Sequence, residues 1–201
     1  VAGAGAVELT VDTTSEESAL KAVDATANTG GVEVDLSNAK LAKVAFTGGA
    51  GADTLTVNGS KAAHDLGAGD DTVVVNDTNL AALDKGFSVD GGDGVDTLVM
   101  SATNAAAMTA ENFKAFTNFE VLGLNGGNGT ITLDRFGDIN HVAIAKALGG
   151  EVTIENMDSE GTLEFNIAAG QNITVNVTEA GEDGHTTDVL NVKLSAADSI
   201  A

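Results

Sequence analysis

The chain of 201 residues contains no Cys, no Pro, no Trp and no Tyr, and its only Arg is Arg135. Without Cys, neither a disulfide framework nor a thiolate metal site can form. Aromatic residues make up 3% of the chain and all of them are Phe, whereas a thick globular core usually draws on large aromatic anchors. The composition therefore favours a thin core between closely spaced β layers.

Basic residues are also scarce, since 9 Lys and Arg stand against 30 Asp and Glu, for a formal net charge of −21. So acidic a chain repels nucleic acid and anionic membrane surfaces, and we expect neither as a partner. Divalent cations are the obvious counter-charge. High net charge also favours disorder, but the periodic Val, Ile and Leu residues argue against disorder throughout.

Long hydrophobic runs are missing as well. No apolar stretch approaches the roughly 20 residues that span a bilayer, so we expect no membrane insertion. The first ten residues, VAGAGAVELT, lack a basic region and reach Glu8 early, so we expect no signal peptide there. The chain begins with Val1, and we expect a fragment or a processed product.

A glycine-rich motif recurs in the first half of the chain. Its copies share Gly at the second and fourth places, Asp at the sixth, Thr at the seventh and an aliphatic residue at the eighth, and they read GGAGADTLT (48–56), LGAGDDTVV (66–74) and GGDGVDTLV (91–99). The second copy starts 18 residues after the first, which is twice nine. A nine-residue half-turn repeat would place Asp53 and Asp71 one layer apart, at a strand spacing of roughly 4.8 Å. Asp96 continues the column if residues 79–85 loop out as a short helical turn. Leu66, at the first place of the second copy, departs from the pattern.

The motif resembles the haemolysin-type calcium-binding nonapeptide repeat of RTX proteins, over roughly residues 48–100. The resemblance implies a parallel β-roll with calcium between successive turns on one side, one ion between 48–53 and 66–71 and another between 66–71 and 91–96. Calcium prefers six to eight oxygen ligands. The implied ligands are the carboxylates of Asp53, Asp71 and Asp96 and the carbonyls of Gly48, Ala50, Gly67, Gly69, Gly91 and Asp93.

The same glycines and aspartates have a purely structural interpretation, in which glycine-rich turns join strands and each Asp bonds the local backbone.

Two stretches later in the chain match the motif less well. GGNGTITL (126–133) has Ile131 in place of Asp, which predicts a turn feeding a strand without metal. GEDGHTTDVLNV (181–192) offers Asp183 and Asp188 as candidate ligands, with a solvated acidic turn as the alternative.

The second half of the chain contains short strand-like runs about ten residues apart: 130–133, 142–144, 152–154, 163–167, 173–177 and 189–194. Both a parallel β-solenoid and an antiparallel sandwich produce such spacing. We favour the solenoid, because it continues the β-roll and needs few aromatic residues. The predicted fold is therefore all-β, with a segment capping the solenoid (1–47), the calcium-binding β-roll (48–100) and a helix followed by further strands (101–201).

Two stretches predict short helices that cover solenoid edges. SEESALKAVDA (15–25) begins with Ser and acidic residues, which suit a helix N-terminus. TAENFKAF (109–116) has Thr109 as a cap, with Phe113 and Phe116 on one face.

No catalytic constellation is evident. HExxH and GxSxG are absent, which removes the zinc protease and serine lipase classes. The three histidines, His64, His141 and His185, share no neighbourhood in the sequence, and for Arg135 we expect a surface ion pair. We expect a protein that is not an enzyme, although a catalytic domain outside these residues would also be consistent.

NFEVLGLNGG (118–127) is similar to segments of RTX-bearing surface-layer proteins. The two resemblances together imply a calcium-dependent extracellular structural protein of a Gram-negative bacterium, exported by type I secretion. Such a protein assembles with copies of itself into a layer or fibre, with cell-surface polysaccharide as a further partner. The alternative is a calcium-stabilised binding module of an RTX adhesin. A flat ladder of regularly spaced Thr would favour the adhesin, and the Thr residues are not regularly spaced along the chain.

Overall fold

Alternating apolar and polar residues build most of the strands, as in Val32–Leu36, where Val32, Val34 and Leu36 are buried and the two acids between them are exposed. The computed structural model describes residues 1–9, 20–38, 41–58, 60–76, 86–166, 170–178 and 188–194. They form two units, residues 1–98 with 114–119 and residues 99–113 with 120–201. Every strand pairing within either unit is parallel. The protein is a parallel β-solenoid, as the sequence predicted, and not an antiparallel sandwich.

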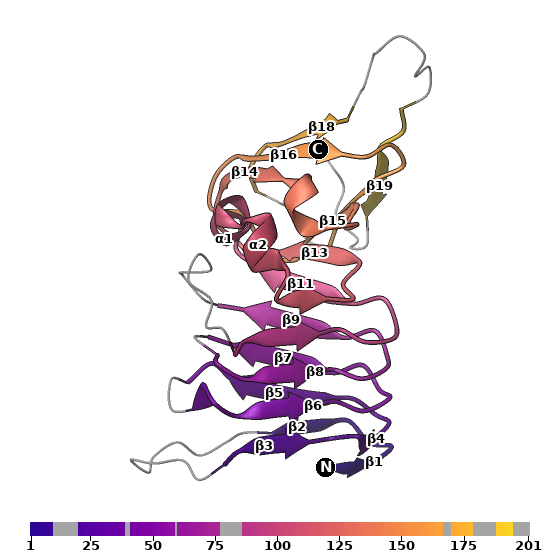
Figure 1. The fold of residues 1–201 in the computed structure, drawn as a ribbon. Helices are drawn as coiled ribbons and strands as arrows, with labels where there is room; N and C mark the ends of the chain where they lie inside the picture. The colour runs from indigo at the N-terminus through magenta and orange to yellow at the C-terminus, as the bar shows by residue number, and fades with distance from the viewer. Residues whose placement is uncertain are drawn as a thin grey trace. The chain divides into compact units, whose positions relative to one another are not determined.

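The first unit stacks its strands in two main sheets, ordered β12-β10-β8-β6-β3 and β9-β7-β5-β2, with β1 pairing β4. Figure 1 shows these strands one above the other in the indigo and magenta part of the chain. They are β1 (Ala2–Gly3), β2 (Val7–Leu9), β3 (Ala22–Asp24), β4 (Ala27–Asn28), β5 (Val32–Leu36), β6 (Ala45–Thr47), β7 (Thr54–Val57), β8 (Ala63–Asp65), β9 (Thr72–Val75), β10 (Ser88–Asp90) and β12 (Phe116–Thr117).

The second unit has the sheets β19-β17-β15-β13 and β14-β16-β18. Strand β11 (Thr97–Met100) crosses the boundary between the two units. The remaining elements are α1 (Ala102–Ala107), α2 (Ala110–Phe113), β13 (Val121–Leu124), β14 (Gly129–Thr132), the 3-10 helix η3 (Leu133–Phe136), β15 (His141–Ile144), β16 (Val152–Met157), β17 (Thr162–Phe165), β18 (Ile173–Val177) and β19 (Asn191–Leu194). All six strand-like runs expected after residue 125 are strands here.

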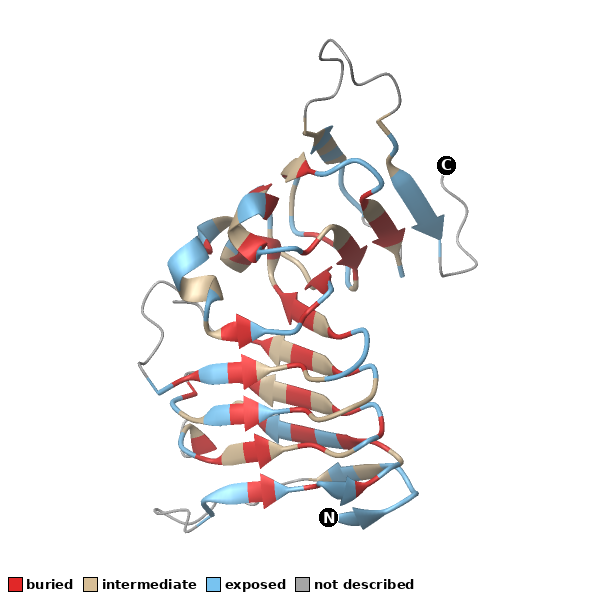
Figure 2. Cartoon of the chain, turned by 45° about the vertical axis from the view of Figure 1, so that its right-hand side comes forward, coloured by how far each residue is buried: buried red, intermediate tan, exposed pale blue. Residues whose placement is uncertain are grey.

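The core consists of columns of side chains that repeat from coil to coil. Val34, Leu55 and Val73 are in register on neighbouring strands, and each is fully buried. The inward positions form the red bands that alternate with exposed and half-buried residues in Figure 2. Because each coil buries small aliphatic side chains against the next, the core needs few aromatic residues.

The two helix predictions have different outcomes. Residues 22–24 of the predicted helix 15–25 are strand β3, which pairs with β6, so the helix prediction is wrong there, and residues 15–19 lie outside the described residues. Sheet pairing wins because Val23 is buried in register with Phe46. Residues 79–85, where a helical turn was expected, also lie outside the described residues.

The helix predicted at 109–116 is confirmed in part, because α2 covers only Ala110–Phe113. Thr109 Oγ1 accepts a hydrogen bond from the Asn112 amide at 3.2 Å, as expected of a cap. The shared face of Phe113 and Phe116 is wrong: Phe113 packs on Phe136 at 5.3 Å, whereas Phe116 lies in β12 and packs on Phe87 at 5.5 Å.

Arg135 makes a different contact from the surface ion pair that was expected. Its Nη1 donates hydrogen bonds to the carbonyls of Ala106 and Met108, at 3.4 and 3.2 Å. These carbonyls end helix α1, so the guanidinium satisfies acceptors that a helix C-terminus leaves without partners.

Candidate metal centre

The glycines shared by the three motif copies let successive turns approach closely. Gly67, Gly69, Gly92 and Gly94 have positive φ angles of 94°, 127°, 98° and 149°. A Cβ atom at Gly92 would collide with the Gly67 carbonyl oxygen, and one at Gly94 with the Gly69 carbonyl oxygen. The second and fourth glycines therefore have a structural reason that is independent of any metal.

The sixth-position aspartates form a buried column. Asp53, Asp71 and Asp96 are 1%, 1% and 0% exposed. Asp71 Oδ1 accepts a hydrogen bond from the Asp53 amide at 2.6 Å, and Asp96 Oδ1 accepts one from the Asp71 amide at 2.8 Å. The predicted stacking of the three residues is confirmed.

The ladder of hydrogen bonds from backbone amides to aspartate carboxylates extends to the turn before the first motif copy. Asp53 Oδ1 accepts a hydrogen bond from the Val32 amide at 2.6 Å, so residue 32 occupies the place of the aspartate in the preceding turn. Asn28 opens that turn and is fully buried, with Oδ1 accepting from the Gly30 amide at 2.9 Å. The motif pattern did not predict this turn, for which the available signal was the pair Gly30-Gly31 before a strand.

The second carboxylate oxygens differ between the first and second copies. In the first copy, Asp53 Oδ2 accepts a hydrogen bond from the Gly49 amide at 2.9 Å. In the second copy, the corresponding amide of Gly67 donates instead to Asp65 Oδ1, at 3.1 Å. Asp71 Oδ2 is left buried and without a hydrogen-bond partner among the described residues.

This environment disfavours a charge on Asp71. Burial raises the pKa of its carboxyl group to about 7, and the nearby carboxylates of Asp96, Asp53 and Asp70 add to the effect, against the hydrogen bond from the Asp53 backbone. A buried carboxylate oxygen without a donor is costly unless a proton or a cation neutralises it. A cation at the second turn would therefore remove this cost.

The first motif position also has a structural explanation. At Gly48 a Cβ atom would collide with Asp53 Oδ2, and at Gly91 it would lie 2.7 Å from Asp96 Oδ2. Leu66 takes this place in the second copy and is fully buried in the core. The carboxylates of Asp53 and Asp96 thus lie close to the backbone of a glycine that has no side chain. In the second copy, the Leu66 side chain packs in the core instead.

Two of the expected carbonyl ligands bond the neighbouring turn. The Gly67 carbonyl accepts from the Asp93 amide and the Asp93 carbonyl accepts from the Gly69 amide, both at 2.9 Å. These bonds join the second and third turns through the bridge between Ala68 and Asp93. A carbonyl oxygen has two lone pairs, so each of them retains one for a cation.

The donor set fits a calcium ion in kind, because it is made only of carboxylate and carbonyl oxygens. Asp71 contributes to this fit, because one of its buried carboxylate oxygens has no hydrogen-bond donor among the described residues. No cluster of three or more His, Cys, Asp or Glu side chains suited to a metal occurs within the described ranges. The expected site draws one carboxylate from each turn and the rest from the backbone, so it does not depend on such a cluster.

Of the two candidate ligands near the C-terminus, the structure describes only Asp188. Asp183 lies outside the described residues. Asp188 is half-buried and belongs to the second unit, whereas the column lies wholly in the first. GGNGTITL behaves as predicted at the level of the backbone, since Gly126, Gly127 and Gly129 have positive φ angles and lead into β14, where Ile131 is buried.

His64 belongs to the first unit and His141 to the second, whereas His185 lies outside the described residues. His64 is 3% exposed inside the first unit, and its Nε2 lies 2.8 Å from Ser60 Oγ. Burial lowers the pKa of His64 to about 4, so the ring is neutral near pH 7.

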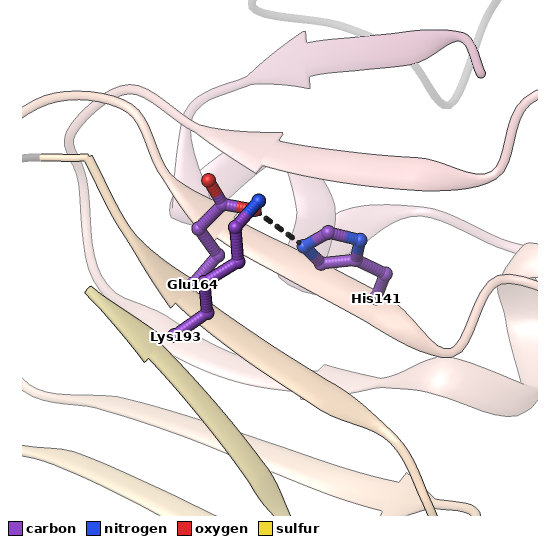
Figure 3. A network of polar contacts seen from close by, with 3 residues as sticks. All are labelled: His141, Glu164 and Lys193. Atoms are coloured by element: carbon purple, nitrogen blue, oxygen red, sulfur yellow. Dashed lines mark hydrogen bonds and ion pairs between the residues drawn. The ribbon is translucent and has the colours of Figure 1, made fainter. Parts of the chain in front are cut away.

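His141 belongs to a polar cluster in the second unit, shown in Figure 3. Glu164 Oε2 lies 3.0 Å from His141 Nε2 and 2.9 Å from Lys193 Nζ. Strands β15, β17 and β19 carry the three side chains, so parallel pairing brings them together. No sequence motif predicted this cluster.

None of the helices in the described part of the chain is both long and apolar enough to span a bilayer. No family model, no curated protein and no solved structure matches this chain. The resemblance to RTX repeats therefore rests on the motif residues alone.

Proposed function

We propose that the protein is a calcium-dependent extracellular structural protein that assembles with copies of itself into a surface layer or fibre on a Gram-negative bacterium. One observation carries the proposal: three aspartates from three glycine-rich turns lie in one buried column, and Asp71 retains a buried carboxylate oxygen without a donor among the described residues.

The residues of the column would hold the ion, with Asp53, Asp71 and Asp96 supplying carboxylates and the turns supplying carbonyls. Calcium, when bound, supplies the positive charge that lets buried carboxylates stay ionised near pH 7. An ion that binds only the folded state stabilises it by RT ln(1 + [L]/Kd), about 2.7 kcal/mol at a hundredfold excess over Kd. Extracellular calcium modules bind at about 10⁻⁴–10⁻³ M, so folding would await the outside of the cell.

Export in an unfolded state through a type I system follows from the same linkage. A net charge of −21 opposes compaction where calcium is scarce. Outside the cell, stacked coils with open ends offer strand edges to further copies or to cell-surface polysaccharide.

A calcium titration followed by circular dichroism and particle size in the same samples tests the proposal. We expect β structure to increase at millimolar calcium, and particles to grow into sheets or fibres. An unchanged spectrum in millimolar calcium would refute the metal site.

The variant Asp71→Asn separates a metal ligand from a structural hydrogen-bond acceptor. Asn keeps the Oδ1 acceptor and removes the buried charge, so we expect the calcium-free protein to become more stable at pH 8 and its stabilisation by calcium to shrink. The folded-state pKa of Asp71 is raised, so its contribution to calcium-free stability is present below its unfolded value near 4 and is lost as pH rises through about 7. That loss should disappear in Asp71→Asn.

Asp138→Asn, a change at an exposed aspartate of the second unit, is the matched control. Equal calcium responses in the wild type and both variants, measured by urea denaturation, would leave Asp71 with a structural role only.

A second function has one specific observation in its favour. Thr130, Thr153 and Thr174 are in register on β14, β16 and β18, and none of them is buried. The regular Thr column that the linear spacing did not indicate is thus present in three dimensions. It favours the binding module of an RTX adhesin, and a calcium-folded chain that stays monomeric would support this alternative.

A further inference from the structure

Strand β19 exposes apolar side chains that continue the core of the second unit. Val192 is in register with Leu163, and Leu194 with Phe165. Leu163 is 5% exposed, whereas Val192 and Leu194 are 53% and 47% exposed. Figure 2 shows β19 exposed along its whole length.

Among the described residues, β19 also has an open hydrogen-bonding edge. In the order β19-β17-β15-β13, β19 is the last strand, and no strand of the described residues pairs with its other edge. An apolar edge strand with unpaired backbone groups is a template for strand addition.

Strand β2 is the corresponding edge of the first unit. It pairs with β5 on one side and ends the sheet on the other, among the strands described. Its residues are Val7, Glu8 and Leu9, of which the two apolar residues are half-buried and Glu8 is exposed.

The two edges match residue by residue. Parallel addition of β2 to β19 places Val7 beside Val192, Glu8 beside Lys193 and Leu9 beside Leu194. The Lys193 side chain is 61% exposed, although its Nζ contacts Glu164 (Figure 3), and so remains accessible to a second carboxylate. Cross-strand pairs of opposite charge and of apolar residues both favour pairing.

We propose that a second copy of this chain docks its β2 edge on the β19 edge in parallel register, so that copies join head to tail. All strand pairs of both units are parallel, so this contact repeats the kind of interface that already joins coil to coil. Head-to-tail contacts that do not close into a ring build filaments. The inference rests on the proposed function, since calcium lowers the repulsion between chains of charge −21.

Cross-linking tests this contact directly, because the chain has no Cys of its own. In the double variant Leu9→Cys/Leu194→Cys, docked copies bring the two thiols within disulfide distance. We expect mild oxidation in millimolar calcium to give a ladder of covalent multimers on a non-reducing gel. The control Leu9→Cys/Thr130→Cys, whose second thiol lies on an exposed face of β14, should give roughly tenfold less multimer.

A charge reversal tests the same register without new covalent bonds. Glu8→Lys opposes Lys193 of the next copy and should raise the concentration needed for assembly roughly five- to tenfold. Asp138→Lys, the same charge change at an exposed site of the second unit, should have a smaller effect.

Dichroism and scattering on the same samples distinguish failure of the head-to-tail contact from failure of the proposed function. Calcium-driven assembly with equal cross-linking in both Cys pairs, or with equal effects of the two Lys variants, overturns the head-to-tail contact and leaves the proposed function standing. Absence of any calcium response refutes the proposed function itself.

Discussion

The two units carry opposite kinds of residue at the sixth position of the glycine-rich motif. In the first unit the residue after the glycine turn is Asp53, Asp71 or Asp96, stacked in a buried column. In the second unit the corresponding residue of GGNGTI is Ile131, in register with Ile154 and Val175. One column buries carboxylates that need a counter-charge, whereas the other buries hydrocarbon. Glycine turns therefore allow coils to stack, and the residue that follows them decides whether stacking buries an acid or a hydrocarbon side chain.

The largest difference between the units should appear when calcium is removed. We expect the amides of β7 and β9 to lose protection from hydrogen exchange in a chelator at pH 8, because the carboxylate column of the first unit then repels itself. The amides of β13 and β15 should keep theirs. Equal loss of protection in both units would contradict the comparison.

Gly94→Ala should be a strongly destabilising substitution in the turns. Gly94 has φ 149° and a Cβ atom there would collide with the Gly69 carbonyl oxygen, so we expect a loss of about 3 kcal/mol in the free energy of unfolding. Gly5→Ala, where a Cβ atom meets nothing within 4 Å, should change it by less than about 0.5 kcal/mol. Urea denaturation in calcium compares the two, and similar losses would refute the close approach of the turns.

The stability of the first unit should also depend on pH through the protonation of His64. Burial depresses the folded-state pKa of His64 to about 4, so its contribution to stability is complete above the unfolded value near 6.5 and is lost as pH falls toward 4. At pH 5 the loss should be about 2 kcal/mol relative to pH 8.

His64→Leu should abolish that acid-dependent loss, because Leu cannot bind a proton. His141, which lies 28% exposed in the second unit, offers the matched control His141→Leu. The pH dependence of the urea midpoint checks both variants, and an unchanged dependence in His64→Leu would contradict the assignment.

The smallest effect concerns the polar cluster of the second unit. Lys193→Ala removes an ion pair whose lysine side chain is 61% exposed, so we expect a loss of about 0.5 kcal/mol that high salt reduces. A loss above about 2 kcal/mol would show that the pair matters more than its exposure indicates.

Much of the fold could be predicted because each coil carries its own local signal. The motif spacing predicted the stacking of Asp53 on Asp71, and the strand-like runs after residue 125 predicted β14 to β19. Prediction failed where a tertiary contact outweighed a local preference. Residues 22–24 favour a helix locally, but burial of Val23 beside Phe46 holds them in a sheet.

The chain's sequence by itself determined the β-strands, the glycine turns and the identity of the buried acids, because period-two alternation and glycine spacing act within a few residues. Only the tertiary structure decided which residues of neighbouring strands lie in register, that the Gly67 amide bonds Asp65 and not Asp71, and that His141, Glu164 and Lys193 meet. These features depend on which coil lies against which. Partners separated by 18 to 29 residues are brought together only when the coils stack.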